Sequence, residues 1–472
     1  MQHWRKTKIV ATIGPASESE RELHGMINAG MNVARLNFSH GTHEEYKEII
    51  QRIRHISDSF HLPVAILQDL AGPKIRIGSF ETETVHLKAD AEFTLTTEQC
   101  IGDEMRVFVN YKDLPKEVSE GSRIMLDDGK INLRVESVRG EKIHCKVVYG
   151  GIIRGSRGVN VPGTHLSIGC LTHKDKEDLE FGVKEKVDFV ALSFVQTADD
   201  IRELRKILDH HKSHAAIIAK IETEEAVANI DEIIEVSDGI MIARGDLAVE
   251  IPAENVPLMQ KLIIKKSIEA GKPVITATQM LDSMIHSPVP TRAEVSDVSN
   301  AILDGTDAIM LSGETATGDH PVLTIETMSR IALKTEGSEL FQEEVRKFKR
   351  TIRGIADSVS SAVTVTAANI EASAIVALSE TGFTPRMISR YKPSQPIFVL
   401  TPHKETLNRS LLSFGCSPEL SPHFTNLNEA TDYAKKFLVQ RKKLKEGDTF
   451  ILCAGIPFGR KGSTNLMVAH TI

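Results

Sequence analysis

Residues 187–246 read VDFVALSFVQTADDIRELRKILDHHKSHAAIIAKIETEEAVANIDEIIEVSDGIMIARGD. Three short apolar runs alternate here with two stretches whose apolar residues stand three or four positions apart. The runs are Val187–Leu192, Ala215–Ala219 and Gly239–Ala243, and the intervening stretches are Asp200–Asp209 and Thr223–Val236. Short runs rich in β-branched residues predict buried strands, and spacing of three and four predicts amphipathic helices. This alternation predicts parallel strands joined by crossover helices.

The same alternation extends in both directions, from Thr7 to Ser312. Five more apolar runs bring the predicted strands to eight, and helical spacing or a proline start marks three further helices. These strands are Thr7–Ile13, Met31–Leu36, Pro63–Gln68, Pro273–Ala277 and Asp307–Leu311, and the helices are Ser19–Ala29, Ala253–Ala270 and one opening at Pro290–Glu294. Eight strands with eight crossovers predict an α/β fold of the (β/α)8 TIM barrel type, with an open doubly wound sheet as the alternative.

Two regions depart from this pattern. Residues 74–170 read as short alternating segments broken by Gly and Asp turns, which predicts an all-β domain inserted into a barrel loop. A domain inserted over the C-terminal face would act as a lid. After a Lys/Glu-rich linker, a fresh alternation predicts a C-terminal α/β domain. We therefore expect barrel segments at 1–73 and 171–340, a lid domain at 74–170 and a regulatory domain at 341–472.

Composition excludes several classes of protein. The formal net charge of −7 and the scattered Lys and Arg residues provide no basic surface for nucleic acid. No stretch of about 18 uncharged apolar residues exists, so we expect no membrane association. The five cysteines form no CxxC pair, and Met1–Lys8 does not begin a signal peptide. We therefore expect a cytoplasmic protein.

Polar residues gather directly after the predicted strands. Any one of them could be a helix cap or a solvated loop residue, as Ser193 and Ser312 could be N-caps and Asp127-Asp128-Gly129 a hairpin turn. In a barrel, however, all these positions face the mouth where active sites lie. The set comprises Arg35, Asn37, Ser39, His40, Asp69, Lys220, Glu222, Arg244, Gly245, Asp246, Thr278, Gln279, Ser312 and Glu314.

Two of these carboxylates, Glu222 and Asp246, are the best placed to bind Mg²⁺, which favours one or two carboxylates completed by water and substrate oxygens. Lys220 stands two residues before Glu222, so both side chains lean to the same side of an extended strand. A fixed cation beside Mg²⁺ suits phosphoryl transfer, although a surface ion pair is the simpler interpretation. No GxxxxGK[ST] loop is present to hold nucleotide phosphates.

Six ordered motifs resemble those of the pyruvate kinase family, and the resemblance runs from about residue 5 to 470. They are Thr7–Ser17 (TKIVATIGPAS), Asn32–Gly41 (NVARLNFSHG), Ala219–Glu222 (AKIE), Ile242–Leu247 (IARGDL), Thr276–Leu281 (TATQML) and Met310–Thr315 (MLSGET). The resemblance implies transfer of a phosphoryl group from phosphoenolpyruvate to ADP, giving pyruvate and ATP, with Mg²⁺ or Mn²⁺. It also implies a homotetramer and a phosphorylated allosteric effector.

The resemblance further assigns roles to individual residues. Lys220, Thr278 and Arg35 would be catalytic, and Glu222 and Asp246 would hold Mg²⁺. The residues that bind substrate would be Arg35, Lys220, Gly245, Asp246 and Thr278. Asn37, His40, Arg76 and Lys174 would bind the nucleotide, and Asn37, Ser39 and Asp69 would form a monovalent-cation site. Ser379, Thr381, Thr384, Arg386 and Arg460 would bind the effector, although Ser379–Arg386 could equally be an ordinary strand-to-helix turn.

The segment Gln68–Arg76 departs from the usual family pattern. Leu70 and Lys74 stand where most relatives carry Thr and Glu, so one potassium ligand is lost and an ammonium is gained. We therefore expect Lys74 to replace K⁺, unless it points to solvent at the lid hinge. Two rival functions also stay open: another metal-dependent barrel enzyme that handles enolpyruvate, and a regulatory relative without turnover.

Overall fold

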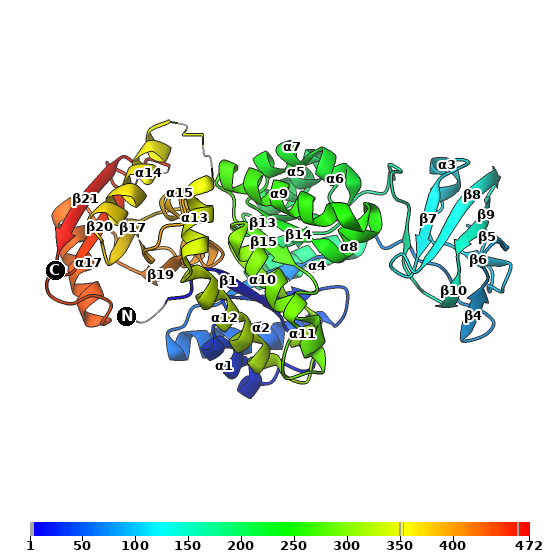
Figure 1. Cartoon of the computed structure of the whole chain (residues 1–472), viewed down its shortest axis with the longest axis horizontal. Coiled ribbons are helices and arrows are strands. Elements are labelled where there is room, and N and C mark those ends of the chain that lie inside the picture. Colours follow the sequence, from blue (N-terminus) through cyan, green and yellow to red (C-terminus); the bar gives the residue numbers. More distant parts are fainter. Residues whose placement is uncertain (1–3, 349–350, 353, 460–461) are drawn as a thin grey trace.

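The computed structural model describes residues 4–348, 351–352, 354–459 and 462–472. Eight parallel strands close into a barrel in the order β1-β16-β15-β14-β13-β12-β3-β2 (Figure 1). The TIM barrel prediction is confirmed, and the open-sheet alternative is wrong. The barrel strands are β1 (Lys8–Thr12), β2 (Val33–Asn37), β3 (Ala65–Asp69), β12 (Phe189–Leu192), β13 (Ala216–Ile221), β14 (Gly239–Ala243), β15 (Val274–Ala277) and β16 (Ala308–Leu311).

Helices surround the barrel, and their ends follow local sequence signals. Thr42 and Thr291 form capping boxes with Glu45 and Glu294 at the starts of α2 and α10. The barrel-domain helices are α1 (Glu20–Ala29), α2 (His43–Phe60), α4 (His173–Lys184), α5 (Ala198–His210), α6 (Glu224–Ala228), α7 (Ile230–Val236), α8 (Arg244–Glu250), α9 (Val256–Ala270), α10 (Arg292–Leu303), α11 (Gly313–Ala316), α12 (Pro321–Glu336) and α13 (Glu339–Lys347).

The single helix predicted over Thr223–Val236 is wrong, because the chain forms α6 and α7 with a break at Asn229. The Asn229 side chain donates to the carbonyl of Gln196 at 3.0 Å, which ties the break to the loop after β12.

The inserted region is an all-β unit with its own apolar core, at the right of Figure 1. Its larger sheet has the order β11-β7-β8-β9-β5-β6, and β10 pairs with β4. Asp127 and Asp128, both at positive φ, lie in the turn between antiparallel β7 and β8, as expected for a hairpin. The elements are β4 (Thr84–Leu87), β5 (Glu92–Thr96), β6 (Arg106–Phe108), α3 (Leu114–Glu117), β7 (Arg123–Leu126), β8 (Ile131–Arg139), β9 (Lys142–Tyr149), β10 (Gly151–Arg154) and β11 (Val159–Asn160).

The C-terminal region is an α/β unit with a five-stranded sheet in the order β19-β18-β17-β20-β21. Only β21 runs antiparallel to its neighbour among the strands described there. Its elements are α14 (Gly354–Asn369), β17 (Ala374–Leu378), α15 (Phe383–Ser389), β18 (Ile397–Thr401), α16 (Lys404–Ser410), β19 (Cys416–Leu420), α17 (Leu427–Gln440), β20 (Thr449–Ala454) and β21 (Leu466–Thr471). No helix in the described part of the chain combines the length and apolarity needed to cross a membrane.

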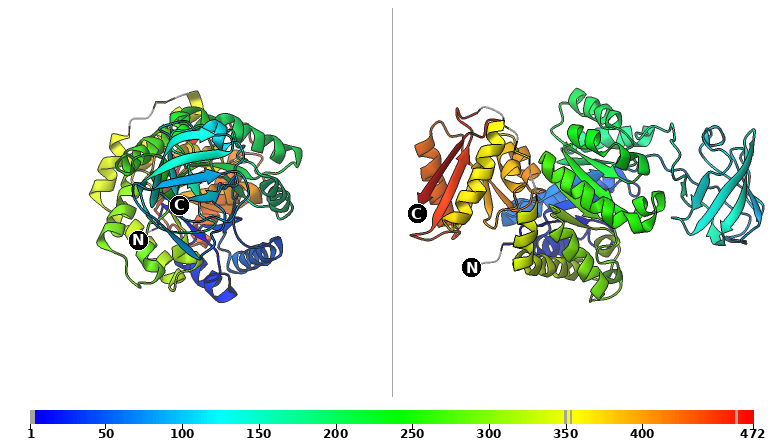
Figure 2. Two further views of the ribbon diagram at one scale, coloured as in Figure 1. Left: turned by 90° about the vertical axis from the view of Figure 1, so that its right-hand side faces the viewer. Right: turned by 45° about the horizontal axis from the view of Figure 1, so that its top comes forward.

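The lid and the C-terminal domain lie at opposite ends of the barrel (Figure 2). Leu411 and Leu412, just after α16, pack with apolar side chains that point into the barrel, such as Val10 and Phe189. Beside them, the buried Lys392 ammonium donates to Asp307 Oδ1 at 2.7 Å, directly before β16. The C-terminal domain therefore closes the end of the barrel that lies away from the strand C-termini.

Shortening Leu412, which fills this end of the barrel, should weaken the fold. We expect Leu412→Ala to lower the free energy of unfolding by about 2–5 kcal/mol, because Leu412 is fully buried and its removal leaves a cavity. Leu420→Ala is the matched control, since that leucine is 49% exposed and should cost less than about 0.5 kcal/mol. Urea denaturation followed by circular dichroism measures both. Equal losses of unfolding free energy in the two variants would contradict this packing role of Leu412.

Candidate active site

A buried charge cluster lies at the mouth of the barrel. Asp69, at the end of β3, is 1% exposed and accepts a hydrogen bond from Arg35 Nε at 2.6 Å. Its second oxygen lies 3.2 Å from the Lys220 ammonium. Burial raises the pKa of Asp69, but the charges of Lys220 and Arg35 outweigh it and hold that pKa below the usual value. The carboxylate thus stays charged between two cations.

The Lys220 ammonium, on β13, contacts three side chains that carry oxygen atoms. Besides Asp69, it lies 3.0 Å from Glu222 Oε1 and 2.7 Å from Ser193 Oγ. Burial lowers the pKa of Lys220, but the negative charges of Asp69 and Glu222 outweigh burial and raise it overall. The lysine is therefore a permanent cation, suited to charge stabilisation rather than to proton abstraction.

Two carboxylates, Glu222 and Asp246, form the acidic side of the cluster. Burial and the negative charge of Glu222 raise the pKa of Asp246 above its usual range. A divalent cation would relieve this repulsion, and two carboxylates with open positions are the donor set that Mg²⁺ prefers. Within the described residues no group of three or more His, Cys, Asp or Glu side chains is arranged around a metal position. Substrate and water oxygens would therefore have to complete the coordination.

Next to these groups lies a strained turn after β15, the strand that pairs with β14 in the barrel. Thr278 and Gln279 both have positive φ, at 69° and 52°, which is rare outside glycine. Thr278 Oγ1 accepts from the Gly245 amide at 2.8 Å and donates to the Ala277 carbonyl at 2.7 Å. Arg244 stabilises the turn by donating to the carbonyls of Ala277 and Thr278.

Arg244 is fixed in turn by a two-pronged ion pair with Asp297 on α10, both contacts being 2.7 Å. Such fork-shaped pairing holds a guanidinium in one orientation. Glu314 has a different role, because its carboxylate accepts hydrogen bonds from the backbone amides of Leu281 and Ser312. Glu314 therefore stabilises the barrel loops and does not extend the carboxylate pair.

Lys74 lies beside Ser39, one of the three residues expected to bind a monovalent cation. Its ammonium donates to Ser39 Oγ at 2.7 Å, and the Ser39 amide donates to Asn37 Oδ1 at 3.3 Å. The alternative in which Lys74 points to solvent is wrong. Burial, followed by the nearby charges of Arg76 and Lys220, lowers the pKa of Lys74. The Leu70 side chain is buried, and its carbonyl already accepts from Ser193 Oγ at 2.7 Å.

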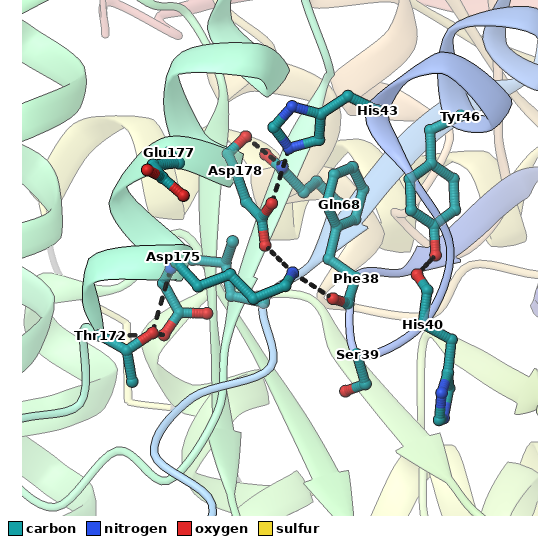
Figure 3. Close-up of polar contacts among 12 residues, drawn as sticks. Phe38, Ser39, His40, His43, Tyr46, Gln68, Thr172, Asp175, Glu177 and Asp178 are labelled. Atoms are coloured by element: carbon teal, nitrogen blue, oxygen red, sulfur yellow. Dashed lines mark hydrogen bonds and ion pairs between the residues drawn. The ribbon is translucent and has the colours of Figure 1, made fainter.

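The predicted nucleotide residues are spread around this cluster. Lys174 donates to Asp178 Oδ2 at 2.6 Å and to the Phe38 carbonyl at 2.8 Å, and His43 contacts the other oxygen of Asp178 at 2.7 Å (Figure 3). His40 is exposed, and its backbone carbonyl accepts from the Tyr46 hydroxyl. Asp178 was not predicted from the sequence, because an acidic residue inside α4 carries no motif.

A cleft of about 720 Å³ separates the lid from the barrel mouth. Arg76, Asp127 and Asp128 line it on the lid side, and Asp246 lines it on the barrel side. This volume lies within the range of small-molecule sites.

The predicted effector residues do not all come together. Ser379, Thr381 and Thr384 line one pocket with Phe458 and Gly459. Arg386 is not part of that lining, and its Nε atom is buried without a hydrogen-bond partner among the described residues. Arg460 lies outside the described residues.

Comparison with known proteins decides the family. The barrel-domain model of pyruvate kinase matches residues 4–325, and the pyruvate kinase alpha/beta-domain model matches residues 357–470. The chain belongs to the pyruvate kinase family. The pyruvate kinase of Geobacillus stearothermophilus is 46% identical over 99% of this chain and 80% of its own length. That of Clostridium perfringens is 45% identical over 99% of this chain and all of its own length.

Solved structures agree with this assignment. A crystal structure of a pyruvate kinase from Cryptosporidium parvum superimposes with a TM-score of 0.94 at 36% identity, covering 99% of this chain and 96% of the other. The chain is therefore a phosphotransferase of the pyruvate kinase family, and a divalent metal is a general requirement of that family.

Proposed function

We propose that this chain transfers the phosphoryl group of phosphoenolpyruvate to ADP, giving pyruvate and ATP in the last step of glycolysis, in the cytoplasm. The observation that carries the proposal is the Lys220 ammonium, held 3.2 Å from Asp69 and 3.0 Å from Glu222, while Asp246 of the same cluster lines the lid cleft. Phosphoryl transfer needs fixed positive charge around the migrating group more than it needs covalent chemistry. The permanent, buried cation of Lys220 supplies that charge.

Each neighbouring residue has a proposed part in the reaction. Lys220 would stabilise the migrating phosphoryl group and the enolate left behind, and Arg35 would bind the phosphate. The P–O bond to the enol oxygen breaks as a bond forms to the terminal phosphate oxygen of ADP. Mg²⁺, or Mn²⁺ in its place, would be held by Glu222 and Asp246 and would neutralise charge on phosphate and carboxylate oxygens. The loop that contains Gly245 would bind the substrate carboxylate.

The enolate carbon must then gain a proton to become the methyl group of pyruvate. Thr278 is the nearest proposed relay, but its hydroxyl proton is directed to the Ala277 carbonyl at 2.7 Å. We therefore infer that a water molecule delivers the proton while Thr278 orients it, because an ordinary hydroxyl is a poor acid.

The remaining contacts concern the nucleotide, the lid and regulation. ADP would be bound by Arg76, Lys174, His40 and Asn37 as the lid, residues 74–170, closes over the cleft and excludes water.

A phosphorylated effector would bind at Ser379, Thr381 and Thr384, although Glu380, paired to His403 at 2.7 Å, brings a negative charge there. A homotetramer is part of the same proposal.

The reaction itself gives the first test. Purified protein with Mg²⁺, ADP and phosphoenolpyruvate should form pyruvate, and Lys220→Met should lower the rate by about a thousandfold or more, because a central electrostatic group is lost. A coupled assay for pyruvate, run with and without ADP, measures this. Turnover that does not need ADP would favour another enolpyruvate enzyme, and effector binding without turnover would favour a regulatory relative.

The second test concerns monovalent cations. We expect wild-type activity to be independent of K⁺, because Lys74 already places an ammonium 2.7 Å from Ser39 Oγ. At ~4 Å and an effective dielectric constant of ~20, a second cation would be repelled by about 4 kcal/mol. Lys74→Glu combined with Leu70→Thr should lower activity in K⁺-free buffer and restore activation by K⁺.

Rates should be compared at about 100 mM K⁺ and at the same ionic strength of a tetraalkylammonium salt, so that screening is matched. Lys88→Glu reverses a charge at an exposed lid position and serves as the control. Activation of the wild type by about tenfold or more with K⁺ would overturn this proposal.

A further inference from the structure

Ser193 connects two segments of the active site through a single hydroxyl group. The residue follows β12 and is 2% exposed. Its Oγ donates to the Leu70 carbonyl at 2.7 Å and accepts from Lys220 Nζ at 2.7 Å. A hydroxyl carries one proton, so donation to Leu70 directs its lone pairs toward the ammonium. The orientation of this hydroxyl is therefore fixed.

The backbone around Ser193 is held equally firmly. Phe194 has φ 54°, a left-handed conformation that a bulky residue rarely adopts. Its amide donates to Glu222 Oε2 at 2.8 Å, and its carbonyl accepts from Cys170 Sγ at 2.9 Å. Strain of this kind persists where surrounding contacts maintain it, and it concentrates at functional sites.

The facing loop fits Ser193 closely. A Cβ atom added at Gly72 would lie 3.0 Å from both Ser193 Cβ and Phe194 Cδ2, so only glycine fits without displacing the serine. The Leu70 amide donates to the Ala191 carbonyl at 3.0 Å, which fixes the carbonyl group that Ser193 contacts. Ser193 is thus held from both sides.

We propose that Ser193 is a positioning residue that sets the place of the Lys220 ammonium, and this inference rests on the proposed function. The ammonium also forms ion pairs with the carboxylates of Asp69 and Glu222, at 3.2 and 3.0 Å, and both carboxylates draw it away from Ser193. The hydrogen bond to Ser193 Oγ at 2.7 Å opposes that pull, so it keeps the ammonium from settling against the carboxylates and holds it in place while the phosphoryl group is transferred.

Kinetics of three variants test this role. Ser193→Ala removes the acceptor, and Ser193→Cys keeps nearly the same volume with a much weaker acceptor. Both should lower kcat by about tenfold or more while KM for phosphoenolpyruvate changes by less than about threefold, because misplacement of a catalytic group acts on the transition state. Ser237→Ala is the matched control: it is another buried serine, at the C-terminal end of α7, bonded to the Ile233 carbonyl at 2.7 Å. It should retain wild-type kcat.

The outcomes separate this inference from the proposed function. Inactive wild-type protein would refute the function, whereas active wild type with unchanged kcat in Ser193→Ala would refute the positioning role alone. A Ser193→Cys variant with wild-type kcat would assign the serine to packing and also overturn the proposal. A crystal structure of Ser193→Ala gives a readout free of turnover: Nζ of Lys220 should move toward Glu222, and an unmoved Nζ would contradict the inference.

Discussion

The carboxylate of Asp69 balances two buried cations, and the arrangement of the active site depends on it. One oxygen accepts from Arg35 and the other lies 3.2 Å from Lys220, both from neighbouring parts of the barrel rim. Burying a charge without a partner costs several kcal/mol, so Asp69 offsets much of the cost of burying Arg35 and shares with Glu222 the balancing of Lys220. These charged side chains thereby hold one another in place.

Closure of the barrel makes this possible. β3 and β13 are separated in the sheet by β12, and parallel pairing in register places their C-terminal ends at one rim. Asp69 and Lys220 are far apart in sequence, yet strand pairing alone brings them within contact. At the other end, Leu411 and Leu412 fill the barrel, so that packing and chemistry occupy opposite ends.

Much of the fold could be predicted because strands and helices leave periodic patterns. The eight apolar runs all became barrel strands, and residues following them, such as Lys220 and Asp246, do lie at one mouth. The contact of Lys74 with Ser39 is present, while the replacement of K⁺ by Lys74 stays a prediction. The strands and the mouth needed only strand order and residue type, whereas the Lys74 prediction came from its departure from the family pattern.

Other features depend on contacts between distant segments, which leave no local pattern. Ser193 resembled a helix N-cap, yet its hydroxyl bonds to Leu70 and Lys220. Arg386 stands only two residues after Thr384 but does not line the same pocket, because residues two positions apart on helix α15 point to different sides of the helix. The break at Asn229 was missed for the same reason, since the bond to Gln196 crosses to another loop.

A double-mutant cycle on unfolding free energy tests the central claim, that Asp69 balances buried positive charge, most directly. Asp69→Asn should cost about 3–5 kcal/mol, because it leaves Arg35 and Lys220 without their shared counter-charge. Adding Lys220→Met should recover part of that loss, giving a coupling of about 1 kcal/mol or more, since the unbalanced cation is then gone. Strictly additive effects of the two substitutions would contradict the account.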